Sequence, residues 1–310
     1  MRKVILDCDP GHDDALAILL AYGCPEIDLL GITTVAGNQT LDRTTLNARR
    51  VCTVAGITDV PICAGSAGPL TRRLVTAPDI HGESGLDGHA FGPPTVPVSD
   101  EHAVDFIVRT LMASDGDVTL VPVGPLTNVA MAVRAEPRIV ERAREVVLMG
   151  GSYSRGNHTP AAEFNIFVDP EAAAVVFGAG WPLTMVGLDL THQAGASPEL
   201  VERVEALGTE VSRMVVDLLG FFRAACRRAE SFSDPPVHDP CAVARVARPE
   251  LVEVRDAHVA VEVHGELTSG MTVTDFRDEP GRPPNAKVAT RLDQEGFWAL
   301  MVDALATYGG

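Results

Sequence analysis

Short apolar runs alternate with segments of helical periodicity along most of this chain, and this alternation strongly limits the folds it can adopt. The apolar runs lie at residues 4–6, 27–32, 60–63, 118–121, 145–149 and 183–186. Between them, apolar residues recur with helical spacing at 43–55, 104–111, 126–133 and 171–177. Short apolar strands joined by helices are typical of a parallel sheet that is buried on both faces. The sequence therefore predicts an α/β fold with a mainly parallel central sheet flanked by helices.

The C-terminal third departs from this alternation. Apolar residues between 211 and 222 keep helical spacing and predict one long helix. Val259, Val261 and Val263 then alternate along an extended run, and Met271 and Val273 alternate after a turn. This pattern predicts a small antiparallel addition to the sheet. No linker-like segment divides the chain, so residues 1–310 are predicted to form a single domain.

An excess of acidic residues limits the partners that this chain can bind. It has 42 Asp and Glu against 25 Lys and Arg, a net charge of -17. Nucleic acids and anionic membranes bind basic surfaces, so we expect neither as a partner. No apolar run approaches the length of about 18 residues that a membrane span needs, and the chain starts directly with a strand-like run, which predicts no signal peptide. The six cysteines are scattered without a C-x-x-C pair, which favours reduced thiols and a cytoplasmic location.

Four aspartates lie within eight residues directly after the first predicted strand: Asp7, Asp9, Asp13 and Asp14. A Pro-Gly turn separates the two pairs, and a helical pattern begins at the second pair. Carboxylates crowded at the end of a strand repel one another unless a cation lies between them, and Ca²⁺ or Mg²⁺ prefers such oxygen ligands. The alternative is that Asp9 caps the helix while Asp13 and Asp14 only complement its dipole.

Further polar residues follow the other predicted strands. Ligands of a parallel sheet bind at the carboxyl ends of its strands, so these residues are expected to share one rim. They lie in the segments 33–38, 123–128, 150–165 and 237–240. The rim is rich in carboxylates and amides and poor in basic residues, and no Walker sequence or G-x-G-x-x-G accompanies it. That chemistry favours a metal ion with a neutral polyhydroxyl ligand over a phosphate.

The segment Asp-Cys-Asp-Pro-Gly-His-Asp-Asp-Ala at residues 7–15 resembles the signature of the inosine/uridine-preferring nucleoside hydrolase family. The resemblance continues in the same order at 33–38, 81–85, 148–151, 162–166, 237–240 and 272–276. It implies an enzyme that hydrolyses the N-glycosidic bond of ribonucleosides to free base and ribose with a tightly held Ca²⁺, in salvage or catabolism. It also implies a homodimer or homotetramer, although nothing in this sequence fixes the number.

The resemblance assigns roles to individual residues. The implied metal ligands are Asp9, Asp14, Asp239 and the backbone carbonyl of Val123. Asp9 is also the implied general base toward the metal-bound water, and His238 the implied general acid toward the leaving base. The implied substrate contacts are Asp13, Asn157, Glu163 and Asn165 near the ribose, Met149 packing beside it, Asn38 beside the water and His81 at the base. Phe164 is a further implied substrate contact.

The sequence departs from the family pattern on the long helix. Members of this branch often carry tyrosines near positions 222 and 226, where this chain has Phe222 and Cys226. Both positions are still expected to contact the base, but neither offers a phenolic hydroxyl, so the preference for purine or pyrimidine is open. The polar, proline-bearing segment 227–236 is predicted to be a mobile flap.

Three other functions share part of this sequence pattern. A phosphatase of the D-x-D type also begins with strand-Asp-x-Asp, but it needs a basic residue near the acidic loop, and none is present. A non-catalytic nucleoside- or sugar-binding protein of the same fold would be expected to have lost Asp9 or His238. A hydrolase of a modified or unusual ribonucleoside is the remaining alternative.

Overall fold

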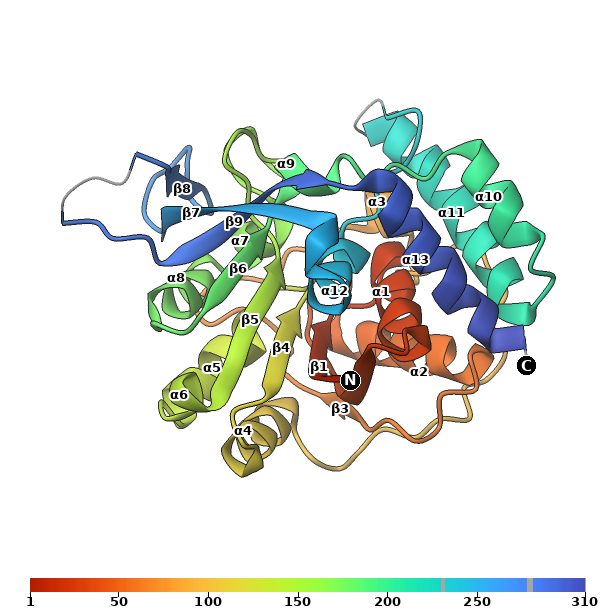
Figure 1. The fold of residues 1–310 in the computed structure, drawn as a ribbon, viewed down its shortest axis with the longest axis horizontal. Helices are drawn as coiled ribbons and strands as arrows, with labels where there is room; N and C mark the ends of the chain where they lie inside the picture. Colours follow the sequence, from red (N-terminus) through yellow and green to blue (C-terminus); the bar gives the residue numbers. More distant parts are fainter. Residues whose placement is uncertain (230–231, 278–280, 310) are drawn as a thin grey trace.

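A nine-stranded sheet forms the centre of the molecule (Figure 1). The computed structural model describes residues 1–229, 232–277 and 281–309. The strands lie in the order β3-β2-β1-β4-β5-β6-β9-β7-β8. Their bounds are β1 Arg2–Cys8, β2 Ile27–Thr34, β3 Ile62–Ala64, β4 Val118–Pro122, β5 Ala143–Met149, β6 Leu183–Val186, β7 Val252–Val261, β8 Thr272–Asp275 and β9 Ala286–Leu292.

The sheet is parallel from β3 to β9 and antiparallel beyond it. β7 pairs antiparallel with β9, and β8 pairs antiparallel with β7. The predicted α/β fold with a mainly parallel sheet and a small antiparallel C-terminal addition is therefore confirmed. The sequence analysis did not identify β9, which is the seventh parallel strand and carries the antiparallel pair.

Helices cover both faces of the sheet (Figure 1). One face packs against α1 (His12–Gly23), α2 (Leu41–Val54), α10 (Pro198–Glu205), α11 (Glu210–Ala229), α12 (Asp239–Ala247) and α13 (Gln294–Ala306). The other packs against α4 (Ala103–Ala113), α5 (Thr127–Ala135), α6 (Ile139–Arg142), α7 (Phe164–Val168) and α8 (Pro170–Gly178). The short helices α3 (Pro78–His81) and α9 (Leu188–Thr191) follow β3 and β6.

Strand β1 shows why the sheet needs both layers. Val4, Leu6 and Cys8 belong to the apolar core on one face, whereas Ile5 belongs to the core on the other. All four side chains are fully buried. Because successive residues of a strand point to opposite faces, an apolar run such as 4–6 requires packing on both sides.

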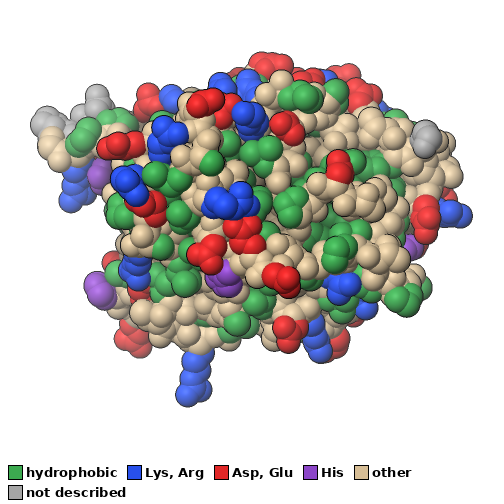
Figure 2. Space-filling view, turned by 90° about the horizontal axis from the view of Figure 1, so that it is seen from below, with side chains coloured by type: hydrophobic (Ala, Val, Ile, Leu, Met, Phe, Trp, Pro, Cys, Tyr) green, Lys and Arg blue, Asp and Glu red, His purple; other side chains and the backbone are tan. Residues whose placement is uncertain are grey.

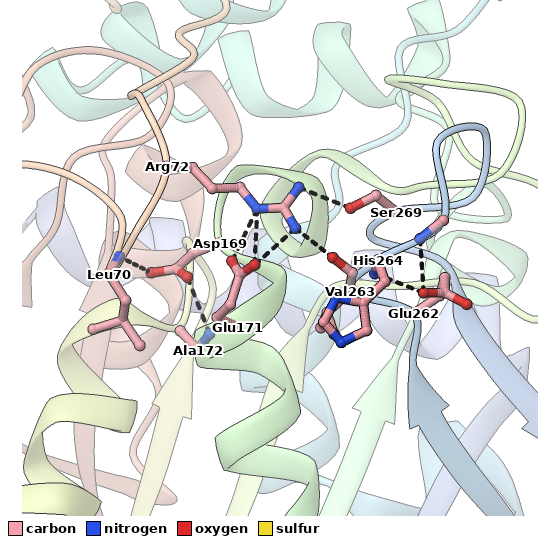
Figure 3. Close-up of polar contacts among 10 residues, drawn as sticks. Leu70, Arg72, Asp169, Glu171, Ala172, Glu262, Val263, His264 and Ser269 are labelled. Atoms are coloured by element: carbon pink, nitrogen blue, oxygen red, sulfur yellow. Dashed lines mark hydrogen bonds and ion pairs between the residues drawn. The ribbon is translucent and has the colours of Figure 1, made fainter.

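The long connection after β3 is fixed to distant elements by Arg72 (Figure 3). Its guanidinium donates to the carboxylate of Glu171 on α8 at 2.8 to 3.1 Å and to the hydroxyl of Ser269 at 2.8 Å. Nearby, the backbone amide of Leu70 donates to Asp169 at 2.8 Å. These contacts hold the start of the segment that leads to α3, so the residues of α3 have a defined position.

Figure 2 shows Lys and Arg side chains dispersed among Asp and Glu on one face. Within the described residues no helix is long and apolar enough to cross a membrane. Five of the cysteines are buried free thiols: Cys8, Cys24, Cys52, Cys63 and Cys241. Part of the predicted flap, residues 230 and 231, lies outside the described residues, so its mobility stays a prediction.

Candidate active site

One cavity of about 260 Å³ opens at the carboxyl ends of the parallel strands. It is lined by residues from β-strand ends, helix starts and the long helix α11: Asp13, Asn38, Ala77, Asp79, Ile80, His81, Val123, Met149, Asn157, His158, Glu163, Phe164, Asn165, Phe222, Cys226, Pro236, His238 and Asp239. Every residue that the sequence analysis assigned to a site lines this cavity except Asp9 and Asp14. Those two are fully buried directly next to lining residues.

The carboxylate of Asp9 is fully buried and closely enclosed by the backbone of two neighbouring loops. One oxygen, Oδ2, accepts a hydrogen bond from the Asn38 backbone amide at 2.6 Å, while Oδ1 is buried without a partner in the described structure. A Cβ at Gly37 would lie 2.1 Å from Oδ2, and a Cβ at Gly124 would lie 2.4 Å from Oδ1. Glycine is therefore required at both positions. The unpaired buried oxygen indicates that Asp9 needs a ligand that the protein itself does not supply.

Asp14, rather than Asp9, caps helix α1. Gly11 is the N-cap residue, and the Asp14 carboxylate accepts hydrogen bonds from the backbone amides of Asp9 at 3.0 Å and Gly11 at 2.9 Å. Asn38 donates to the same carboxylate through Nδ2 at 3.1 Å. The capping role considered for Asp9 is therefore wrong. The helix start instead fixes Asp14 within the acidic cluster.

Three carboxylates meet beside the cavity, and two of them belong to residues that line it. Asp13, Asp14 and Asp239 each offer an oxygen within 4.8 Å of the others. Burial, followed by repulsion from neighbouring carboxylates, raises the pKa of Asp14 to about 7 and the pKa of Asp239 well above its usual value. Neither Lys nor Arg lines the cavity as far as the chain is described. Buried acids with raised pKa values and no basic neighbour fit a hard divalent cation.

This cluster shares Asp14 and Asp239 with the predicted side-chain ligands and contains Asp13 in place of Asp9. Asp13 was expected at the ribose, but its oxygen lies with those of Asp14 and Asp239. The predicted carbonyl ligand, that of Val123, accepts a hydrogen bond from Asn165 Nδ2 at 2.7 Å. A carbonyl oxygen has two lone pairs, so this bond leaves one available for a cation.

The wall formed by α7 and the loop before it holds the residues assigned to the ribose. Glu163 is the N-cap of α7: its oxygens accept from the backbone amides of Gly151, Asn165 and Ile166 at 2.8 to 3.1 Å. Burial raises the pKa of Glu163 to about 7. Asn157 is exposed, and its Oδ1 accepts from the Phe164 amide at 3.0 Å. These bonds place amide and carboxylate groups along one side of the cavity.

Two histidines also line the cavity, and each has a ring nitrogen next to a side chain from a remote part of the chain. His238 Nδ1 lies 2.7 Å from the hydroxyl of Thr191, and His81 Nδ1 lies 3.1 Å from Nδ1 of His12. Burial lowers the pKa of His238 to about 4 and the pKa of His81 well below its usual value. Both imidazoles are therefore neutral near pH 7. The ring of Phe222 stacks on His12 and His81 at centroid distances of 5.4 and 5.8 Å.

Comparison with known proteins decides the family. The sequence profile described as inosine-uridine preferring nucleoside hydrolase matches residues 4–299. The chain belongs to this family. The predicted family and the predicted enzyme class, an N-ribohydrolase acting on N-glycosyl compounds, are thereby confirmed.

Other nucleoside hydrolases resemble this chain over its whole length. It is 50% identical to an inosine-uridine preferring nucleoside hydrolase of Crithidia fasciculata, over 99% of this chain and 98% of that protein. It is 48% identical to a pyrimidine-specific ribonucleoside hydrolase, RihB, of Escherichia coli, with the same coverage. Among solved structures, a purine-preferring ribonucleoside hydrolase from Gardnerella vaginalis superposes with a TM-score of 0.93 at 32% identity, covering 99% of both chains.

Several residues of this nucleoside hydrolase cavity were missed by the sequence analysis. Ala77, Asp79 and Ile80 reach the cavity from the long connection after β3, and His158 and Pro236 reach it from two other connections. No periodicity or motif marks these positions, because their place depends on how each loop is anchored. His12 and Thr191 were also missed as partners of the two histidines. His12 could have been considered, since it lies inside the aspartate motif.

Proposed function

We propose that this nucleoside hydrolase is a Ca²⁺-dependent enzyme that hydrolyses the N-glycosidic bond of ribonucleosides to free base and ribose. The observation that carries the proposal is that buried carboxylates and two buried histidines line the same cavity. Oxygen ligands suit the sugar end, because ribose offers hydroxyls to a cation. Neutral imidazoles suit the base end, where hydrogen-bond donors and acceptors are needed.

The acidic cluster would hold the cation. We assign Asp9, Asp14, Asp239 and the Val123 carbonyl as ligands, with Asp13 beside them. When bound, Ca²⁺ supplies positive charge that holds ribose hydroxyls and lowers the pKa of a water molecule. The unpartnered Oδ1 of Asp9 and the raised pKa values of Asp14 and Asp239 support this assignment.

Asp9 would act as the general base toward the attacking water. Its Oδ1 is the oxygen assigned to the cation, and its Oδ2, which accepts one hydrogen bond from the Asn38 amide, keeps a second lone pair for the proton. Asp13, Asn157, Glu163 and Asn165 would face the ribose as positive charge develops on the sugar. Such oxygens favour an oxocarbenium-like transition state electrostatically.

His238 would assist departure of the base. Since burial lowers its pKa to about 4, the ring is neutral near pH 7 and assists by donating a hydrogen bond rather than as an imidazolium. As the C1′–N bond breaks, the base takes the electron pair, and a ring N–H stabilises the resulting charge. His81, Phe222 and Cys226 would contact the base from α3 and α11.

The base preference stays open within this proposal. The names of three similar proteins refer to inosine and uridine, to pyrimidines and to purines. Phe222 and Cys226 line the cavity without a phenolic hydroxyl, so a purine, a pyrimidine or a modified base could each be accepted. Turnover of inosine, adenosine, guanosine, uridine and cytidine by the purified enzyme, with and without a chelator, tests the reaction and ranks the bases.

A deoxynucleoside tests the assigned sugar end. 2′-Deoxyuridine lacks one hydroxyl of the proposed cation-bound pair, so it should be cleaved far more slowly than uridine. Equal turnover of the two substrates would contradict the assigned ribose site. The absence of turnover for every nucleoside, together with measurable binding, would favour the non-catalytic alternative.

The assembly and location of the enzyme are also proposals. We expect residues 1–310 to act as one catalytic domain in a homodimer or homotetramer, in the cytoplasm. Light scattering of the purified protein measures the number of subunits.

A further inference from the structure

We propose that Thr191 is a positioning residue for His238, whose ring it holds in the form that carries its proton on Nε2. The Thr191 hydroxyl would donate a hydrogen bond to Nδ1, so that Nε2–H is the donor offered to the leaving base. This inference rests on the proposed role of His238 and adds the residue that sets the direction of its hydrogen bond.

The two residues meet through tertiary structure alone. Thr191 ends α9, and His238 immediately precedes α12, 47 positions further along the chain. The segments between and beside them are paired: the Val237 amide donates to the Ala194 carbonyl at 3.1 Å, and the Ala196 amide donates to the Pro235 carbonyl at 3.0 Å. This pairing fixes the hydroxyl of Thr191 at 2.7 Å from Nδ1 of His238.

Burial determines which atom donates. Thr191 is fully buried, and within the described part of the chain its hydroxyl has no hydrogen-bond partner other than His238. If the hydroxyl accepted a hydrogen bond from Nδ1–H, its own proton would be buried without an acceptor, which is costly. If the hydroxyl donates to Nδ1, both groups are satisfied. The second arrangement is therefore favoured, and it leaves Nε2 as the nitrogen that carries the ring proton.

The other contacts of His238 do not determine which ring nitrogen carries the proton. Its backbone amide is held separately, donating to Asp13 Oδ2 at 3.3 Å. The ring of His192 contacts it edge-on, with centroids 5.7 Å apart, without a hydrogen bond in the described structure. Removing the Thr191 hydroxyl should therefore free the ring proton to occupy either nitrogen, while the attachment of the backbone to Asp13 persists.

The test compares two substitutions on two kinds of substrate. Thr191→Val keeps the shape but removes the hydroxyl, and Thr191→Ser keeps the hydroxyl but removes the methyl group. We expect Thr191→Val to lower kcat for inosine and uridine about 10-fold to 100-fold, the range seen when the hydrogen-bond partner that orients a metal-ligating histidine is removed. Its kcat for p-nitrophenyl riboside should change little, because that leaving group needs no hydrogen bond. Thr191→Ser should restore most of the activity.

Several results would overturn the proposal. Equal losses on nucleosides and on p-nitrophenyl riboside would indicate a structural role for Thr191, as would a Ser variant that folds normally but is as slow as the Val variant. If Thr191→Val does not fold, the nitrogen-15 NMR signals of His238 in the wild-type enzyme decide, with His238→Gln for assignment. A proton on Nδ1 would overturn the proposal, and a proton on Nε2 would support it.

The companion variant His238→Ala separates this inference from the proposed function. If His238→Ala slows nucleosides and p-nitrophenyl riboside equally, the leaving-group role itself is wrong. If it slows nucleosides selectively but Thr191→Val does not, the role of His238 stands and only the inference about Thr191 fails.

Discussion

The proposed site has an acidic end, formed by Asp9, Asp13, Asp14 and Asp239, and a base end, which includes His81 and His238. These two groups of residues are built in different ways. At the acidic end, Asp9, Asp13 and Asp14 come from one turn between β1 and α1, and backbone amides of that turn hold Asp14. At the base end, His81 and His238 lie 157 positions apart in the sequence, and each contacts a side chain from another element. The local motif thus supplies most of the acidic end, which Asp239 completes from α12, whereas long-range contacts orient both histidines.

This difference has an energetic basis. Buried carboxylates repel one another, so the acidic end needs both a rigid backbone and a cation to balance its charge. Neutral imidazoles carry no such cost, and single hydrogen bonds suffice to orient them. We therefore expect changes at the acidic end to affect every substrate, and changes at the base end to depend on the leaving group.

Removal of the cation should have the largest effect. Without it, Asp9, Asp14 and Asp239 lose the charge that balances them, and kcat should fall about 10³-fold, corresponding to several kcal/mol of lost stabilisation. The melting temperature should fall as well, because a ligand bound only by the folded state stabilises it. Metal analysis, activity and thermal unfolding before and after chelation measure these effects. Full activity in metal-free protein would contradict the assigned cation site.

Asp9→Ala should be the most damaging single substitution at the acidic end. It removes the proposed base and a proposed ligand together, so kcat should fall by at least about 10²-fold on nucleosides and p-nitrophenyl riboside alike. Asp42→Ala is a matched control, since Asp42 is an exposed acid in the first turn of α2. Steady-state kinetics of both variants decide. A loss confined to nucleosides would show that Asp9 assists the leaving base and does not act on the attacking water.

His238→Ala should separate the substrates. We expect kcat for inosine and uridine to fall about 10²-fold, the lower end of what acid–base assistance contributes, while p-nitrophenyl riboside is largely spared. The measurement is the ratio of kcat values for the two substrate types in the variant and the wild type. A ratio that does not change would assign His238 to positioning of the sugar, which belongs to the acidic end.

Cys226→Ala should have the smallest effect. Cys226 lines the base end on α11 beside Phe222, in a position where we assign it contact with the base and no proton transfer. We expect KM to change about 2-fold to 3-fold and kcat to change little, as for the loss of one small packing contact. A large fall in kcat for inosine or uridine would show that the thiol takes part in activating the leaving group.

The sequence predicted the acidic end more completely than the base end. The motif at 7–15 could be interpreted locally, because a strand, a turn and a helix start determine where Asp9, Asp13 and Asp14 lie. It did not predict that the oxygen of Asp13 lies with those of Asp14 and Asp239, since Asp239 arrives from α12. Nor did it predict the tight enclosure of Asp9 by Gly37 and Gly124, which follow two other strands.

By itself, the sequence determined the alternation of strands and helices, the parallel sheet and the family. Apolar periodicity and a local motif can be recognised from residues that are close together in the chain. Only the tertiary structure decided that Thr191 meets His238, that His12 meets His81 and that α3 reaches the cavity. These contacts join segments from different strand ends, anchored by groups such as Arg72. The physical reason is that a side chain's hydrogen-bond partner depends on long-range packing, for which the local sequence carries no signal.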